Sequence, residues 1–389
     1  MSHALLSASG ASRWLVCTPS ARLEEQFPDN AGEAAKEGTL AHDICETMLL
    51  ERLGVISREL AEERIAGAVA NPLYFDGMLD YCEDYATFVF GQFKDYQRKT
   101  PDTIIEIEVK LDFNEWVPEG FGTGDAVIIT GGTLHIIDFK FGKGVPVSCE
   151  QNKQMMLYAL GALYLYKWLY NITNVVMTVY QPRLENVSSW EVSAESLEIW
   201  AEIYLKPVAT QAYNGEGDFT PGDHCRFCKA KNRCRGLAAF NQEVEKYCPG
   251  TSDTLTDDEI ADILTRADMY VSWINSITDY AQDQAVNHGK HWPGFKLVEG
   301  RSVRTYLDET KVAQALLNNN IPRDAIYVEK LLGITAMEKA ITKKKFDTLL
   351  SGLVIKPEGK PTLVPLSDKR PALNTAEKAA QAFADADLT

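Results

Sequence analysis

The spacing of hydrophobic and polar residues changes along this chain, and each spacing predicts one kind of secondary structure. In the first 100 residues, apolar positions recur at helical spacing and predict helices at about 34–53, 59–69 and 79–100. A shorter helix is predicted at 13–17, after serines that can cap its start. Residues 104–113 alternate as a strand does, which would place Glu106 and Glu108 on one side of a sheet.

Two β-rich runs joined by two glycines predict a hairpin. Residues 124–130 and 133–138 flank Gly131 and Gly132, a pair that readily forms a two-residue turn. The elements predicted after the hairpin are a helix at about 150–170, a strand at 175–181 and a helix at 194–213. This order favours an α/β fold with a mixed sheet flanked by helices.

The last third of the chain has a different pattern. Thr256 and Glu259 form a capping box that predicts the start of a long helix ending near residue 286. Beyond it we expect a small α+β C-terminal appendage, with a second capping box at 335–338 and a short helix or frayed tail in the last dozen residues. The predicted organisation is a main domain at 1–250, a connecting helix at 251–290 and the appendage at 291–389.

The hairpin carries the most informative chemistry. With the turn at the two glycines, Asp125 lies opposite Asp138, with Cβ atoms roughly 4.5–5.5 Å apart, and Lys140 points to the same face. Carboxylates so close repel each other unless one is protonated or a cation lies between them, and a divalent metal is the natural cation. The alternative, ordinary acidic residues at strand ends, is weakened because the intervening residues are apolar on both faces, where unpaired charges are costly.

Eight cysteines suggest a second site. Three of them, in the pattern Cys225-x2-Cys228-x5-Cys234, have the spacing of metal ligands. A tetrahedral zinc or a cubane iron–sulfur cluster needs a fourth ligand, for which the candidates are Cys17, Cys248 and His224. The cysteines expected to be small buried hydrophobic residues are Cys45, Cys82 and Cys149.

Composition and charge narrow the class of protein. The 389 residues include 45% hydrophobic and 24% charged residues, as in an ordinary globular protein. The net charge of −16 argues against indiscriminate binding to nucleic acid, but it allows a local basic groove. No apolar run is long enough to span a membrane, and the N-terminus lacks a signal pattern, so we expect a cytoplasmic protein without a membrane partner.

Several motifs, taken in order, resemble the RecB-like branch of the PD-(D/E)XK nuclease superfamily. They include the features of its iron–sulfur members, such as the AddB nuclease domain and the CRISPR-associated RecB-like exonucleases, and the layout looks like phage-encoded members. The matching motifs are Gly38-x3-His42, Gly122-x2-Asp125, Asp138-x-Lys140, Gln154-x3-Tyr158, and Cys17 with the cysteine triplet. The resemblance covers residues 7–235, and the proline of the superfamily name is replaced by Gly124.

The resemblance implies a restriction-endonuclease-like fold and a metal-dependent DNA nuclease. An exonuclease is the expected form, acting in phage recombination, replication or DNA end processing. The implied metal ligands for Mg²⁺ or Mn²⁺ are His42, Asp125 and Asp138. Asp125, Asp138 and Lys140 would be catalytic, and Gln154 and Tyr158 would contact DNA. A [4Fe–4S] cluster, with Zn²⁺ as the alternative, would be held by Cys17, Cys225, Cys228 and Cys234.

Other interpretations remain open at this point. His42 can be a hydrogen-bonded helix histidine, and Gln154 and Tyr158 can be the polar edge of a buried helix. The second functional hypothesis is a nucleic-acid-binding or assembly module with an inactive nuclease core, and the third is a zinc-ribbon regulatory protein. The expected partner is single- or double-stranded DNA, with a single-strand-binding or annealing protein as a further partner in a bacterial or phage-infected cell.

Overall fold

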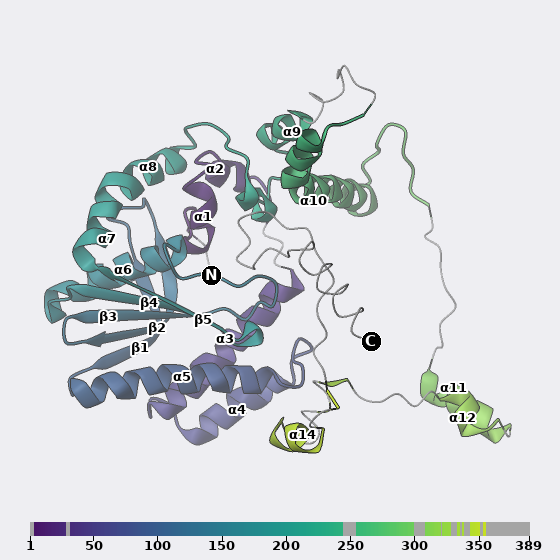
Figure 1. Ribbon diagram of the computed structural model, residues 1–389, viewed down its shortest axis with the longest axis horizontal. Helices are drawn as coiled ribbons and strands as arrows, with labels where there is room; N and C mark the ends of the chain where they lie inside the picture. The colour runs from purple at the N-terminus through teal and green to yellow at the C-terminus, as the bar shows by residue number, and fades with distance from the viewer. Residues whose placement is uncertain are drawn as a thin grey trace, which may run out of the picture. The chain divides into compact units, whose positions relative to one another are not determined.

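A five-stranded sheet flanked by helices forms the centre of the first part of the chain (Figure 1). The computed structural model describes residues 4–28, 32–243, 254–298, 308–319, 321–327, 333, 334, 337, 343–350, 353 and 354. The chain divides into two compact units, Met1–Lys290 and His291–Thr389. The predicted mixed α/β architecture is confirmed.

The sheet follows the order of the chain. Its strands are β1 (Ile104–Asp112), β2 (Phe121–Thr130), β3 (Thr133–Phe139), β4 (Asn174–Gln181) and β5 (Asn186–Ser193). Neighbouring strands run antiparallel except β3 and β4, which are parallel. A parallel pair requires a crossover connection, and here α6 (Lys153–Tyr170) supplies it.

Helices cover both faces of this sheet, which explains the nearly continuous apolar run through the hairpin. One hydrophobic core lies between the sheet and α6, with contributions from α1 (Ala11–Trp14), α7 (Ala194–Trp200), the π-helical η3 (Ala201–Leu205) and α8 (Lys206–Asn214). The other core lies under α3 (Glu33–Arg52) and α5 (Met78–Lys99), and α4 (Arg58–Val69) packs against α3.

Most predicted elements of the first unit are confirmed to within a few residues. Strand β5 is an exception, because the sequence pattern did not predict it. The predicted helix at 194–213 is interrupted by η3 between α7 and α8, and the predicted helix at 13–17 ends at Trp14. The remaining short elements near the N-terminus and the cysteines are η1 (Ala8–Gly10), α2 (Ser20–Glu24), η2 (Pro182–Leu184), η4 (Asp223–Phe227) and α9 (Arg235–Gln242).

The predicted capping box is present at the start of α10 (Asp257–His288). The Thr256 side chain accepts the backbone N–H of Glu259, and the Glu259 carboxylate accepts that of Thr256 at 2.7 Å. In the second unit, the described helices are α11 (Glu309–Asn318), α12 (Arg323–Ile326) and α14 (Lys343–Leu349). The two capping residues of the predicted box at 335–338, Thr335 and Glu338, and the predicted terminal helix or tail lie outside the described residues.

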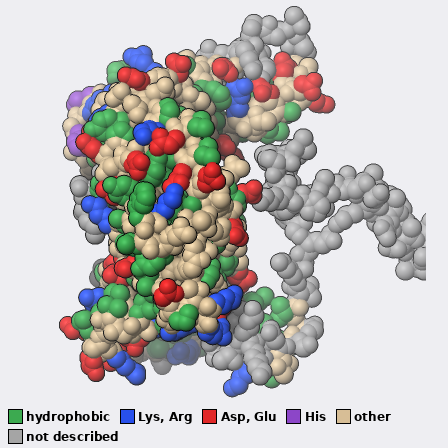
Figure 2. Space-filling model, turned by 90° about the vertical axis from the view of Figure 1, so that its left-hand side faces the viewer, with side chains coloured by type: hydrophobic (Ala, Val, Ile, Leu, Met, Phe, Trp, Pro, Cys, Tyr) green, Lys and Arg blue, Asp and Glu red, His purple; other side chains and the backbone are tan. Residues whose placement is uncertain are grey.

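The surface seen from the left of Figure 1 mixes acidic, basic and hydrophobic side chains, so on this face the negative charge is not gathered into one patch (Figure 2). Among the residues that the structure describes, no helix combines the length and the apolar composition that a membrane span requires.

Candidate metal centre

The hairpin has the register that the sequence predicts. Thr130 pairs with Thr133, and the pairing continues to Ala126 with Ile137. Gly132 lies in the turn at φ 82°, a backbone conformation that suits glycine. Asp125 follows this ladder directly, and its Oδ2 accepts the backbone N–H of Phe139 at 2.6 Å.

The ladder between β1 and β2 is interrupted at Glu108 and Asp125. The pairs on either side are Ile107–Ala126 and Val109–Gly124. Glu108 has φ 50°, a left-handed conformation that is uncommon for a residue other than glycine and that often marks a functional site. The interruption therefore lies where two carboxylates meet.

The strand changes face at this interruption. Ile107 packs into the core under α3 and α5, whereas Val109 packs into the core on the α6 side. Glu106 is on the α6 side of the sheet, where burial and, to a smaller extent, the charge of Glu106 raise the pKa of Tyr166, while Glu108 faces His42 on α3. The expectation that Glu106 and Glu108 share a side is wrong, because regular alternation ends at Glu108.

His42, Glu108 and Asp125 form a compact cluster whose ligand atoms all lie within 4.8 Å of one another. His42 Nδ1 is 3.3 Å from Asp125 Oδ1 and 3.9 Å from Glu108 Oε1. Burial lowers the pKa of His42, but the charge of Asp125 and the closeness of the Asp125 and Glu108 carboxylates outweigh it and raise the pKa to about 10. The imidazole ring packs edge-on against Phe139 at a centroid distance of 5.2 Å, which fixes its orientation.

Asp138 and Lys140 form the other half of the site. Asp138 is almost fully buried, with 2% of its surface exposed. Lys140 Nζ donates to Asp138 Oδ1 at 3.1 Å and lies 2.9 Å from Oδ2. Burial raises the pKa of Asp138, and the charge of Asp125 raises it further, although Lys140 opposes both effects. The two aspartates therefore interact electrostatically, as the hairpin geometry predicts.

Helix α6 supplies the two polar side chains that were expected at the site, Gln154 and Tyr158. Gln154 Nε2 donates to the hydroxyl of Tyr158 at 3.0 Å and lies 3.5 Å from Asp138 Oδ1. Gly122 allows this approach, because a Cβ atom there would lie 2.6 Å from the Tyr158 ring. The first glycine of the Gly-x2-Asp motif thus has a packing reason, namely close contact between β2 and α6.

The donor set suits a divalent cation. A metal ion would have to displace the proton of His42, since an imidazole ligand is neutral. With His42 neutral, three carboxylates and one ammonium leave an excess of two negative charges, from Glu108, Asp125, Asp138 and Lys140. Mg²⁺ prefers oxygen ligands, and Mn²⁺ also accepts an imidazole nitrogen, so the residues present match either ion. Glu108 was not among the residues predicted for the site, although it lies on the strand that neighbours the Gly-x2-Asp motif.

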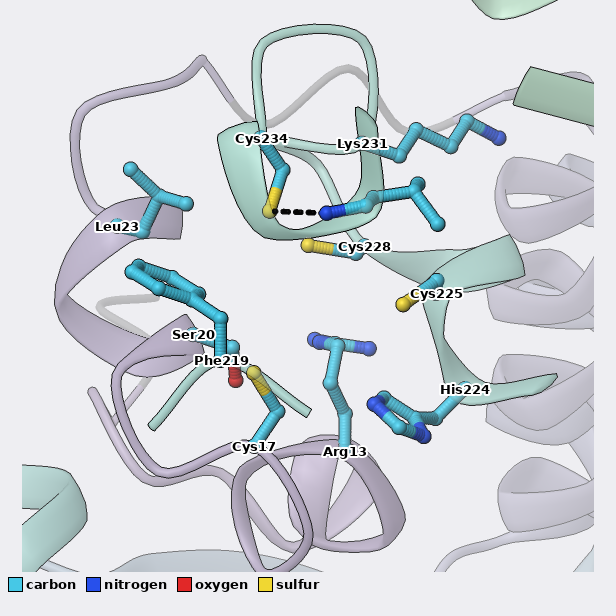
Figure 3. A pocket seen from close by; sticks show the side chains of 11 residues that line it. Arg13, Cys17, Ser20, Leu23, Phe219, His224, Cys225, Cys228, Lys231 and Cys234 are labelled. Atoms are coloured by element: carbon cyan, nitrogen blue, oxygen red, sulfur yellow. Dashed lines mark hydrogen bonds between the residues drawn. The ribbon is translucent and has the colours of Figure 1, made fainter. Parts of the chain in front are cut away.

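The four cysteines suggested by the resemblance surround one small cavity (Figure 3). Cys17 follows α1, and the other three come from η4 and the turn that leads into α9. Cys234 also caps α9, since its sulfur accepts the backbone N–H of Leu237 at 3.4 Å. Burial raises the pKa of the Cys17 and Cys225 thiols and that of Cys228 to about 12.

Charged residues join the two segments that bear the cysteines. Arg13 points into the cavity and donates from Nε to Glu24 Oε2 at 2.7 Å. Glu24 Oε1 accepts the backbone N–H of Lys229 at 2.6 Å, so one carboxylate holds both segments. Four sulfur donors around one cavity match a tetrahedral zinc as well as a cubane iron–sulfur cluster.

Other candidate residues are placed as follows. His224 lines the same cavity, whereas Cys248 lies outside the described residues. Cys45, Cys82 and Cys149 are buried to 3%, 0% and 0% exposure, as expected for small hydrophobic residues.

The first unit is thus a mixed α/β protein with a histidine–carboxylate–lysine cluster beside its sheet and a separate four-cysteine cavity. The chain matches a family model described as "Protein of unknown function (DUF2800)" over residues 3–371, and it belongs to that family. A solved structure titled "Crystal structure of SSO0001" is similar at 15% identity, covering 57% of this chain and 95% of that chain, with a TM-score of 0.22. Similarity at that level carries no argument about fold or function.

Proposed function

We propose that this protein is a divalent-metal-dependent deoxyribonuclease with a restriction-endonuclease-like core, and that it acts as an exonuclease. The convergence of His42, Glu108 and Asp125 from α3, β1 and β2 supports this proposal. The adjacent pair Asp138–Lys140 at the end of β3 adds a positive charge that can offset negative charge developing on a phosphate.

The chain's own residues have distinct tasks in this proposal. His42, Asp125 and Asp138, with Glu108, would hold Mg²⁺ or Mn²⁺, which lowers the pKa of a bound water and polarises the phosphoryl oxygen. Lys140 keeps a positive charge beside Asp138, where it can orient the attacking water and offset charge that develops on the phosphate. Because an imidazole ligand suits Mn²⁺ better than Mg²⁺, activity with Mn²⁺ should at least equal activity with Mg²⁺.

Cleavage of end-labelled DNA tests the proposal. Protein purified without oxygen is incubated with single- and double-stranded substrates in Mg²⁺ or Mn²⁺. Asp138→Ala and Lys140→Ala should abolish cleavage while DNA binding persists. Glu106→Gln is a matched control, because it changes a carboxylate on the same strand as Glu108 that faces away from His42, and it should leave cleavage intact.

Two outcomes would change the proposal. Wild-type protein that cleaves neither substrate with either metal would favour the second hypothesis, a binding or assembly module with an inactive core. Covalently closed circular DNA separates the two kinds of nuclease, because an exonuclease leaves it uncut whereas an endonuclease linearises it.

For the cysteine site we propose a [4Fe–4S] cluster with a mainly structural role. Cys17 and Cys225 lie 208 positions apart (225 minus 17). By analogy with cross-links that close loops of this size, a shared metal group would stabilise the fold by about 5 kcal/mol. Broad visible absorbance that disappears in Cys228→Ser, together with bound iron, would support the cluster. A colourless protein that contains zinc would contradict it.

A further inference from the structure

The segment that carries the cysteine triplet has a charge opposite to that of the whole chain. Residues 226–235 contain five lysines and arginines and no acidic residue, in a chain of net charge −16. The basic residues are Arg226, Lys229, Lys231, Arg233 and Arg235. Such a local reversal of charge is a feature of surfaces that contact polyanions.

An exposed aromatic side chain lies within this segment. Phe227, between two cysteines of the site, is 72% exposed. The backbone beneath it is held by hydrogen bonds from Cys225 N to Gly222 O at 2.8 Å and from Cys228 N to Cys225 O at 3.1 Å. The Arg226 guanidinium lies 5.8 Å from the centre of the Phe227 ring. The backbone around Phe227 is therefore already ordered, and it presents an aromatic ring beside a cation. Binding through this ring would cost little additional conformational entropy.

Neutralisation of the cysteine thiolates does not account for Lys231 or Phe227. Arg13 already points into the ring of sulfur atoms, whereas the side chain of Lys231 extends away from them (Figure 3). Lys231 Nζ instead donates to the backbone carbonyl of Arg226 at 2.9 Å. An exposed phenylalanine contributes no charge, so neutralisation gives no reason for Phe227.

We propose that residues 226–235 form a contact surface for single-stranded DNA, in which the Phe227 ring stacks on a base while Arg226 and Arg235 contact phosphates. Stacking requires a base that is not already stacked in a duplex, so the surface should select single strands. The inference deepens the proposed nuclease and rests on it for the choice of DNA as the polyanion. It concerns a surface separate from the residues assigned to hydrolysis.

Fluorescence anisotropy with a labelled oligothymidine measures this contact directly. The full-length protein, with its cysteine site loaded and without added Mg²⁺ or Mn²⁺, is compared with Phe227→Ala. Loss of one stacked base should weaken binding by roughly 5- to 150-fold, and Phe227→Trp should restore it. Trp168→Ala is the matched control, since Trp168 is 91% exposed on α6 and should not affect binding.

Salt dependence tests the phosphate contacts. Arg226→Gln should reduce the slope of log affinity against log salt concentration by about 0.7, the value expected for one phosphate contact on a single strand. Metal content and absorbance of each variant are measured alongside, so that a change in binding can be separated from loss of the cysteine site.

The results separate this inference from the proposed function. Equal affinities of wild type and Phe227→Ala would overturn the inference even if the wild type cleaves DNA. An equal loss of affinity for duplex and single strand would also overturn it, because stacking cannot explain that result. Binding that depends on Phe227 in a protein that never cleaves DNA would uphold the inference and refute the nuclease.

Discussion

Stability at mildly acidic pH should depend on one buried histidine of the sheet. His135 is 3% exposed, and its Nε2 lies 2.9 Å from Thr178 Oγ1, which in turn lies 2.8 Å from Ser189 Oγ. Tyr96 packs edge-on against the imidazole at a centroid distance of 5.8 Å. Burial lowers the pKa of His135 from 6.5 to about 4, because a charged imidazole would lose its hydration there.

The sign and size of the effect follow from proton binding. Between pH 6.5 and about 4, unfolded protein binds a proton at His135 that folded protein does not bind, so stability falls as the pH falls. The contribution is fully present above pH 6.5. About 2 kcal/mol is lost by pH 5, and about 3 kcal/mol once the pH drops below the folded-state pKa.

Denaturant unfolding of wild type and His135→Phe at pH 7 and pH 5 measures this loss. Phenylalanine keeps a ring against Tyr96 and cannot titrate, and the hydrogen bond to Thr178 that it removes costs the same at both pH values. Wild type should lose about 2 kcal/mol more than the variant between the two pH values. His288→Phe, which replaces an exposed histidine, should behave as wild type. Equal losses in wild type and His135→Phe would refute the reasoning.

Three further predictions concern the two candidate sites and the core between β1 and α6. Glu108→Gln removes a carboxylate that faces the metal cluster and should weaken Mn²⁺ binding by about tenfold or more in calorimetry, whereas unchanged affinity would exclude Glu108 as a ligand. Gly161→Ala would place a Cβ atom 2.9 Å from Leu111 Cβ and should lower the free energy of unfolding by about 1–3 kcal/mol, and unchanged stability would contradict the close packing of α6 on β1. Arg13→Met breaks the ion pair with Glu24 and should speed metal loss to a chelator, and an unaltered rate would show that this pair does not support the cysteine site.

The core of the fold could be predicted from the sequence because its elements are long and strongly patterned. Helices α3 and α5 bury apolar residues at helical spacing, and the hairpin β2–β3 is located by two continuous apolar runs joined by two glycines. Strand β5 was missed for a physical reason. Within the described part of the chain it pairs only with β4, and exposed and half-buried residues alternate along it, so its sequence from Asn186 to Ser193 is largely polar and resembles a loop.

The candidate metal site likewise contains residues that the sequence predicts and one residue, Glu108, that it did not predict. Asp125, Asp138 and Lys140 follow from the hairpin register, which depends on neighbours in the chain. Glu108 depends on contacts that are distant in sequence, because it faces His42 across the gap between β1 and α3.

Regular alternation would have placed Glu108 on the α6 side of the sheet, beside Glu106. The interruption of the β1–β2 ladder and the left-handed backbone at Glu108 turn it toward α3 instead. A residue other than glycine held at φ 50° costs on the order of 1 kcal/mol or more, so the surrounding structure has to hold it in place. The nearby His42 partly opposes the rise in pKa that burial and Asp125 impose on the Glu108 carboxyl. A bound divalent cation would compensate the clustered carboxylates more fully, which gives a physical reason for a strained acidic residue at this point of the sheet.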